Sequence, residues 1–381
     1  MTGRLQIGAI RSSFAPWEDP LLKPLVRFEA VSKRFGETAA VSEVSLAIYE
    51  GEFFALLGPS GCGKTTLMRM LAGFETPDAG RILLDGEDIA PLPPHRRPVH
   101  MMFQSYALFP HLTVAQNVAF GLKQRGDPKA EIDARVDEML GLVKLAGLGR
   151  RRPDQLSGGQ RQRVALARAI APSPRILLLD EPLAALDRKL REETRVELMA
   201  LQQTLGMTFV IVTHDQDEAM VLADRIAVMR DGEVAQVGRP AEIYEAPADR
   251  YVAGFVGDVN LFEARLDSVD GGRVRLASPE GRFEADDDDP PEVGATAWLA
   301  VRPEKMRLTV EPPPEGPNRL SGRISDIGYL GDWTTYGVEI APGRVIRAAR
   351  ANAARRVEAP LGWDDQVWLA FAPDAAVVLK R

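Results

Sequence analysis

The stretch that most constrains the fold of this chain is GPSGCGKTT, Gly58 to Thr66. It fits the pattern G-x-x-x-x-G-K-[ST], it follows the apolar run FFALL, and it precedes LMRMLA, which is typical of a helix. Glycine-rich backbone between a strand and a helix can wrap closely around phosphates, and the N–H groups of the helix N-terminus attract anions. The stretch therefore predicts a phosphate-binding loop in an α/β domain.

The residue types in this loop suit a nucleoside triphosphate bound with Mg²⁺. We expect Lys64 to neutralise the β- and γ-phosphate oxygens and Thr65 to offer its hydroxyl to the metal, while backbone N–H groups surround the phosphates. The predicted nucleotide contacts are Gly58, Pro59, Ser60, Gly61, Cys62, Gly63, Lys64, Thr65 and Thr66.

Cys62, the single cysteine of the chain, lies inside this loop. One interpretation is a small residue that fills space, and the other is a reactive thiol, because a helix N-terminus favours the thiolate. We expect alkylation of Cys62 to block ATP hydrolysis and Mg-ATP to slow the alkylation. A single cysteine also excludes an internal disulfide and fits a reducing compartment.

Several polar side chains follow apolar runs of the kind expected for buried strands. ILLLDEP ends in Asp180 and Glu181, and adjacent acids at such a place are costly unless a metal or a reacting water uses them. We expect Asp180 to hold Mg²⁺ and Glu181 to polarise the attacking water. His214 ends FVIVTH, where it can reach the γ-phosphate from the carboxyl edge of a parallel sheet. Gln104, after VHMMF, is a candidate to contact the metal and the water through its amide.

A second candidate anion site lies about 90 residues after the first, in QLSGGQRQRVALARA. Ser157, Gly158 and Gly159 stand directly before a run of good helix formers that contains no proline. A hydroxyl and two glycines at a helix N-terminus form an anion cradle, because free N–H groups and the positive end of the helix dipole point the same way. One ATP-binding domain would thus carry two phosphate cradles.

Charge and hydropathy narrow the class of protein. The first 240 residues carry 30 basic and 30 acidic side chains, and residues 241–381 carry 17 and 24, so the net charge of −7 belongs to the last third. Neither part is basic, which argues against nucleic acid as the main partner. No apolar run approaches the ~18 residues that span a bilayer, and the N-terminus lacks the apolar core of a signal peptide. We therefore expect a soluble, cytoplasmic protein.

The pattern changes twice along the chain. From Val26 to about Val237 short apolar runs alternate with helical segments, which is typical of a parallel sheet covered on both faces. Between them, KAEIDARVDEMLGLVKLAG predicts an amphipathic helix in an inserted helical subdomain. After about Pro247, short β-like pieces separated by Gly, Pro and Asp predict a small barrel or sandwich. The expected parts are a loose arm over 1–24, an ATPase domain over 25–245 with its helical subdomain at about 105–174, and a β-rich regulatory or dimerisation domain over 246–381.

These motifs together resemble the ATPase subunits of ABC transporters. Lys64, Gln104, LSGGQ, ILLLDE, AALD and His214 occur in the order and spacing of that family. The resemblance implies an α/β fold with a P-loop NTPase core and two such domains associated head to tail. Each ATP then lies between the phosphate loop of one copy and LSGGQ of the other. The second cradle would serve the γ-phosphate of the partner copy through Ser157, Gly158, Gly159 and Gln160.

Two further roles follow from the resemblance. Phe35, in SKRFGET, matches the aromatic residue that stacks on adenine, with a buried core phenylalanine as the alternative. Asp187 matches the acid of the loop that couples the two nucleotide sites. The family often has serine where this chain has Ala184, so we expect one hydroxyl contact to be missing there, with a modest effect.

The segment after Gln104 is the candidate for contact with a membrane partner. Tyr106, Leu108, Phe109 and Pro110 are apolar or aromatic where a solvated loop would be polar. They either pack under the helical subdomain or form a groove that accepts a short helix of a membrane-spanning partner. The family resemblance implies two transmembrane permease subunits, a place on the inner face of the cell membrane and, indirectly, a periplasmic or extracellular solute-binding protein.

The last third of the chain bears on the direction of transport and on the identity of the solute. AVRPEKMRL lies in a β-rich region that resembles the small OB-like, TOBE-type barrel of importer ATPases, and YLGDWTTYGV is similar to the putrescine/spermidine importers. The resemblance implies an ATP hydrolase that energises polyamine uptake. Two alternatives stay open: an importer for another solute such as sugar, sulfate or iron, and a non-transport ABC ATPase acting on nucleic acid or ribosomes. The last class needs a long inserted coiled coil or two cassettes, and this chain has one cassette.

Overall fold

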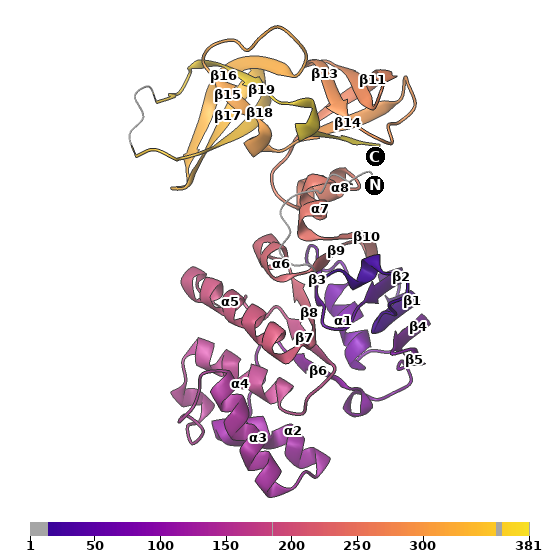
Figure 1. Cartoon of the computed structure of the whole chain (residues 1–381), viewed down its shortest axis with the longest axis vertical. Coiled ribbons are helices and arrows are strands. Elements are labelled where there is room, and N and C mark those ends of the chain that lie inside the picture. The colour runs from indigo at the N-terminus through magenta and orange to yellow at the C-terminus, as the bar shows by residue number, and fades with distance from the viewer. Residues whose placement is uncertain (1–13, 185, 356–359, 381) are drawn as a thin grey trace. The chain divides into compact units, whose positions relative to one another are not determined.

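The computed structural model describes residues 14–184, 186–355 and 360–380 of the chain, and these divide after residue 241 into two compact units (Figure 1). Of the expected N-terminal arm, residues 1–13 lie outside the described residues, as does Ala185 of the AALD stretch. The described part of the arm contains a short 3₁₀ turn, η1 (Pro16–Glu18), whose Glu18 carboxylate accepts a hydrogen bond from Arg239 at 2.6 Å.

The first unit is built on a six-stranded sheet with the order β10-β9-β3-β8-β7-β6. Strands β9, β3, β8, β7 and β6 run parallel to their neighbours, and β10 is antiparallel to β9. The central strands are buried almost throughout, as their unbroken apolar runs predict. Their bounds are β3 (Phe53–Leu57), β6 (Val99–Met102), β7 (Ile176–Asp180), β8 (Thr208–Thr213), β9 (Arg225–Arg230) and β10 (Glu233–Gly238).

A second sheet in this unit differs from the predicted alternation of parallel strands and helices. Its four strands are antiparallel, in the order β2-β1-β4-β5. At the start of β1, Val26 and Phe28 are buried and Arg27 is exposed, so one face of the strand packs on the core and the other faces solvent. The bounds are β1 (Val26–Phe35), β2 (Thr38–Ile48), β4 (Ala79–Leu84) and β5 (Glu87–Asp88).

Helices follow the strands of the six-stranded sheet, and a helical segment separates β6 from β7. Each helix of that segment whose N-cap is a hydroxyl residue has a capping box: Thr113 with Gln116, and Ser157 with Gln160. The helical segment contains α2 (Val114–Arg125), α3 (Lys129–Leu142) and α4 (Gly158–Ile170), and the helices next to the sheets are α1 (Lys64–Ala72), α5 (Arg188–Leu205) and α6 (Gln216–Leu222).

The second unit consists of two five-stranded antiparallel sheets around one core, the TOBE-like half of the expected fold (Figure 1). Phe262, Phe283 and Phe371 pack against one another in that core. The first sheet has the order β13-β12-β11-β14-β20, with β11 (Asn260–Asp270), β12 (Arg273–Ser278), β13 (Gly281–Asp286), β14 (Thr296–Val301) and β20 (Ala376–Leu379). The second has the order β15-β19-β16-β17-β18, with β15 (Arg307–Thr309), β16 (Arg319–Tyr329), β17 (Trp333–Ala341), β18 (Arg344–Ala351) and β19 (Gln366–Ala370).

Two short helices, α7 (Pro240–Glu245) and α8 (Arg250–Phe255), lead into these sheets. Arg302, in the AVRPEKMRL run, is buried and donates hydrogen bonds to the carbonyls of Tyr244 and Ala253, at 2.9 and 2.8 Å. Its guanidinium also lies 4.1 Å from the centre of the Tyr244 ring. This arginine therefore fastens both helices to the β-rich unit.

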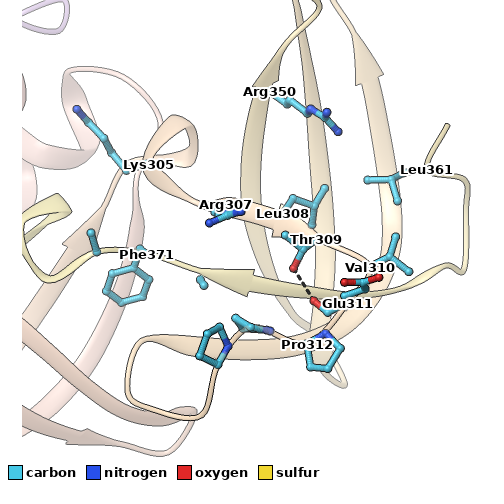
Figure 2. A pocket seen from close by; sticks show the side chains of 14 residues that line it. Lys305, Arg307, Leu308, Thr309, Val310, Glu311, Pro312, Arg350, Leu361 and Phe371 are labelled. Carbon is cyan, nitrogen blue, oxygen red and sulfur yellow. Dashed lines mark hydrogen bonds between the residues drawn. The ribbon is translucent and has the colours of Figure 1, made fainter. Parts of the chain in front are cut away.

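The β-rich unit has a hollow of about 820 Å³ beside the short edge strand β15 (Figure 2). Arg307 and Arg350 line it together with the apolar side chains of Leu308, Leu361 and Phe371. Figure 2 shows these side chains coming from β15, β18 and the segments around β19. All of them belong to the second unit.

Candidate functional site

The predicted catalytic side chains meet at the carboxyl edge of the six-stranded sheet. Because β3, β8, β7 and β6 are parallel, the segments that leave them gather at one edge. Leu57 pairs in register with Thr213, and Asp180 with Val212. The phosphate loop after β3, His214 after β8, Glu181 after β7 and Gln104 after β6 are thereby brought to the same place.

The phosphate loop is fixed by close backbone contacts at its glycines. Gly63 has φ +99° and is the N-cap of α1, and a Cβ there would lie 2.2 Å from the Ala40 carbonyl oxygen. A Cβ on Gly58 would lie 2.6 Å from the Met229 carbonyl oxygen. Glycine is therefore required at both positions. Pro59, Ser60, Gly61 and Thr65 are exposed, Thr66 is partly buried and Cys62 is buried.

Lys64 is buried and donates hydrogen bonds to two carbonyls of its own loop. Its Nζ lies 2.7 Å from the Gly58 oxygen and 2.8 Å from the Pro59 oxygen. The Cys62 sulfur is 3.7 Å from the same nitrogen. The Cys62 side chain is only 4% exposed and belongs to the core cluster under the loop, so an alkylating reagent reaches it only when the loop opens.

Glu181 is held by two of the other predicted site residues. Gln104 Nε2 donates to Glu181 Oε2 at 2.9 Å, and His214 Nδ1 lies 3.0 Å from Glu181 Oε1. A proton on Nδ1 is donated to the carboxylate in this arrangement. Both carboxylate oxygens are thus oriented by side chains from neighbouring strand ends, which leaves each oxygen a free lone pair for water.

The preceding acid, Asp180, is in an unfavourable place for a charge. Burial, followed by the charge of Glu181, raises the pKa of Asp180 above its ordinary value, and the cations Arg69 and Lys64 partly oppose the shift. Arg69 was not among the predicted site residues. It lies on α1 five residues after Lys64, a spacing that does not by itself place the two side chains on one face of the helix.

The second cradle has its own separate structure. Ser157 is the N-cap of α4, its hydroxyl accepts from Gln160 N at 3.3 Å, and Gln160 Oε1 accepts from Ser157 N at 3.0 Å. Gly158 has open space around it, whereas a Cβ on Gly159 would lie 3.3 Å from the Leu190 side chain. In Figure 1 the strands β6 and β7 are drawn between α4 and α1. The two cradles are therefore built as different sites of one unit.

Phe35 and Asp187 lie outside the cluster around Glu181. Phe35 is 50% exposed at the end of β1, with Lys33 Nζ 5.6 Å from its ring centre, so it is not a core phenylalanine. Asp187 is exposed and caps α5 by accepting from Leu190 N at 3.0 Å. Since Leu190 also contacts the Gly159 position, Asp187 and the second cradle share one packed corner.

The apolar segment after Gln104 has a strained and well-anchored backbone. Tyr106 and Ala107 have φ of +61° and +43°, and Arg168 donates to both of their carbonyls, at 2.8 and 2.7 Å. Phe109 packs on Phe120 with ring centres 4.5 Å apart. Part of the cluster therefore packs against the helical segment.

Next to this segment, several large apolar side chains remain exposed. Phe74, Phe103 and Phe120 are 46%, 36% and 37% exposed, and the rings of Phe74 and Phe103 are 5.7 Å apart. Exposed aromatic side chains that lie against each other, as those of Phe74 and Phe103 do, are typical of an interaction surface. None of the helices in the described ranges is both long and apolar enough to cross a membrane.

Two family models match the chain. One, described as ABC transporter, matches residues 41–184, and one, described as TOBE domain, matches residues 299–379. The chain is 51% identical over 360 residues to the putrescine transport ATP-binding protein PotG of Escherichia coli strain K12, covering 94% of this chain and 96% of that protein. It is 53% identical over 332 residues to the spermidine/putrescine import ATP-binding protein PotA 2 of Pseudomonas aeruginosa strain PAO1, covering 87% and 92%.

Two solved structures resemble part of the chain. A dimeric ATP-binding cassette in a post-hydrolysis state, bound to ADP and Pi, is 34% identical with a TM-score of 0.51 and covers 56% of this chain and 98% of that chain. The protein cbiO1 of Clostridium perfringens, part of the ABC transporter complex cbiONQ, is 33% identical with a TM-score of 0.54 and covers 58% and 91%.

Proposed function

This chain belongs to the ABC transporter ATP-binding proteins that carry a TOBE domain, and from that premise we propose that it hydrolyses ATP to energise the import of putrescine and spermidine. The similarity to polyamine transport proteins extends through both units, which supports the same class of solute. The observation that carries the catalytic part is the Glu181 carboxylate oriented by Gln104 and His214 at the end of β7.

In the proposed reaction, Glu181 polarises a water that attacks the γ-phosphate, and ADP leaves with the bonding electron pair. Lys64 exchanges its hydrogen bonds to the Gly58 and Pro59 carbonyls for the β- and γ-phosphate oxygens, where it stabilises the developing charge. His214, next to the carboxylate, positions the γ-phosphate. Phe35 offers its exposed ring to the adenine.

Mg²⁺ fits the donors around the loop. The Thr65 hydroxyl, the Asp180 carboxylate and the Gln104 amide oxygen are hard oxygen ligands of the kind that Mg²⁺ prefers. Gln104 donates to Glu181 through Nε2, so its Oε1 is available to a cation. Mg²⁺ is commonly held by one or two carboxylates together with substrate phosphates, so the ion would be held jointly with the nucleotide. Its charge would assist phosphoryl transfer.

The second cradle supports a head-to-tail homodimer. Ser157 and Gln160 bond to each other rather than to the phosphate loop, and Gly158 leaves open space for an approaching anion. We propose that Ser157–Gln160 contact the γ-phosphate bound by the partner copy, so that ATP closes the dimer and hydrolysis releases it. Asp187, packed beside this cradle, would couple the two sites.

The proposed contact with two permease subunits is the exposed pair of Phe74 and Phe103, together with the exposed Phe120 of α2. It suits a short partner helix with apolar anchors, which would place the chain on the cytoplasmic face of the membrane, served indirectly by a solute-binding protein. Two functions stay open for the β-rich unit: dimer contact, and regulation through a ligand in the hollow of Figure 2.

Uptake of labelled putrescine and spermidine tests the proposal. Cells that lack the gene are complemented with the wild-type chain or with Glu181→Gln, which should bind ATP but turn over at least a hundredfold more slowly. We expect only the wild type to restore uptake. Hydrolysis by Glu181→Gln at the wild-type rate would show that Glu181 is misassigned. Hydrolysis by the wild type without polyamine uptake would point to another solute.

A further inference from the structure

The residue after the proposed catalytic glutamate is held by a side chain of the second cradle's helix. Gln162 lies on the first turns of α4 and is 2% exposed. Its Nε2 donates to the Pro182 carbonyl at 3.0 Å, in a hydrogen bond that is itself buried. Gly159 and Gln162 share the buried face of α4 at a spacing of three residues.

The backbone of Glu181, directly before Pro182, has a strained conformation that its neighbours must hold in place. Glu181 has φ +45°, in the left-handed region that costs a residue other than glycine on the order of 1–3 kcal/mol. A residue stays in that region only when its surroundings determine the conformation. On one side Glu181 N donates to Val212 O at 2.9 Å, and on the other the Pro182 carbonyl accepts from Gln162.

A glutamine at position 162 lowers the stability of the fold. Gln162 Oε1 is buried and finds no hydrogen-bond partner among the described residues. A buried acceptor without a partner opposes folding, and a methionine of similar shape would avoid it. The bond that Nε2 makes to Pro182 is the feature that only the amide supplies.

We propose that Gln162 is a positioning residue for hydrolysis. By fixing the Pro182 carbonyl it holds Glu181 in its left-handed backbone conformation, and thereby keeps the carboxylate between Gln104 and His214. Because α4 begins at the second cradle, the same bond ties a copy's own Glu181 to the cradle that contacts the partner's γ-phosphate. This inference rests on the proposed role of Glu181.

A matched pair of variants separates positioning from folding. Gln162→Met removes the amide at nearly constant volume. Thr194→Val removes a buried hydroxyl whose bond, to Leu190 O at 2.7 Å, stays within α5. Both side chains line the same hollow of about 210 Å³ between α4 and α5. We expect Gln162→Met to lower kcat about tenfold with ATP affinity within twofold, and Thr194→Val to keep kcat within twofold.

The double variant with Glu181→Gln supplies the deciding readout. If Gln162 acts through Glu181, adding Gln162→Met to Glu181→Gln should leave the residual rate unchanged. A further tenfold loss there, or a kcat for Gln162→Met equal to that of Thr194→Val, would overturn the inference. Hydrolysis by Glu181→Gln at the wild-type rate would instead show that Glu181 is misassigned in the proposed function, so the two failures are distinguishable.

Discussion

The two cradles of the first unit offer the same chemistry, a glycine-rich helix N-terminus, but they are constructed differently. The phosphate loop is shaped by backbone: Gly63 and Gly58 sit against carbonyl oxygens, and Lys64 holds two more carbonyls. The second cradle is shaped by side chains, through the reciprocal bonds of Ser157 and Gln160, and its Gly158 is unconfined. The first is therefore built within one chain, whereas the second leaves an open surface, where we propose that the partner copy binds.

The glycines should show this difference most strongly. Gly63→Ala places a Cβ 2.2 Å from a backbone oxygen at φ +99°, so we expect a loss of about 3 kcal/mol in the free energy of unfolding and at least a hundredfold weaker ATP binding. Gly158→Ala is the matched control, because nothing lies within 4 Å of its Cβ. We expect it to keep both stability and ATP binding by the single copy. Chemical denaturation and nucleotide titration measure the two quantities, and equal damage from both variants would contradict the comparison.

Removing the cap of the second cradle should have an intermediate effect. Ser157→Ala loses the hydroxyl that accepts from Gln160 N, and an N-cap of this kind contributes about 1 kcal/mol. ATP binding by the single copy should stay within twofold of the wild type, while ATP-dependent dimerisation weakens. Analytical ultracentrifugation in a Glu181→Gln background would measure the dimer. Unchanged dimerisation, with the stability loss present, would show that Ser157 serves only the helix.

Sequence reasoning succeeded where local pattern determines structure. GPSGCGKTT between a strand and a helix, and the apolar runs before Asp180 and His214, predicted the α/β core and the side chains that now surround Glu181. The left-handed backbone of Glu181 was not predictable, because its carboxylate pattern gives no sign of φ. Nor was Gln162, since a glutamine in a polar QRQR run gives no sign that it faces a carbonyl 20 residues away.

The same limit applies to the β-rich unit. Short strands were evident in the sequence, but their partners were not, because pairs such as Trp298 with Leu379 join distant segments. The one-sided antiparallel sheet of β1, β2, β4 and β5 was missed for a related reason. Bulges interrupt the alternation that would have revealed it, as the register shifts between β1 and β2 show.

The smallest expected effect on stability belongs to Asp180, the acid beside the first cradle. Its sign is unusual, because removing this charge should stabilise the folded chain. Because burial and the neighbouring Glu181 raise the pKa of Asp180, this carboxyl binds its proton more tightly in the folded chain than in the unfolded chain. Its stabilising contribution is then present at low pH and is lost as the pH rises through the folded pKa. At neutral pH and without nucleotide, the ionised Asp180 should therefore oppose folding.

Asp180→Asn tests this directly, because it removes the charge and keeps the shape. In nucleotide-free protein at pH 8 we expect its thermal midpoint to lie about 2 °C or more above that of the wild type, and the difference to shrink at pH 4. The same variant should lose Mg²⁺-dependent hydrolysis, since the carboxylate is the proposed metal ligand. Gly158→Ala removes no charge, so it should show no pH-dependent difference from the wild type. A lower midpoint for Asp180→Asn at pH 8 would mean that Arg69 and Lys64 outweigh the burial of the charge.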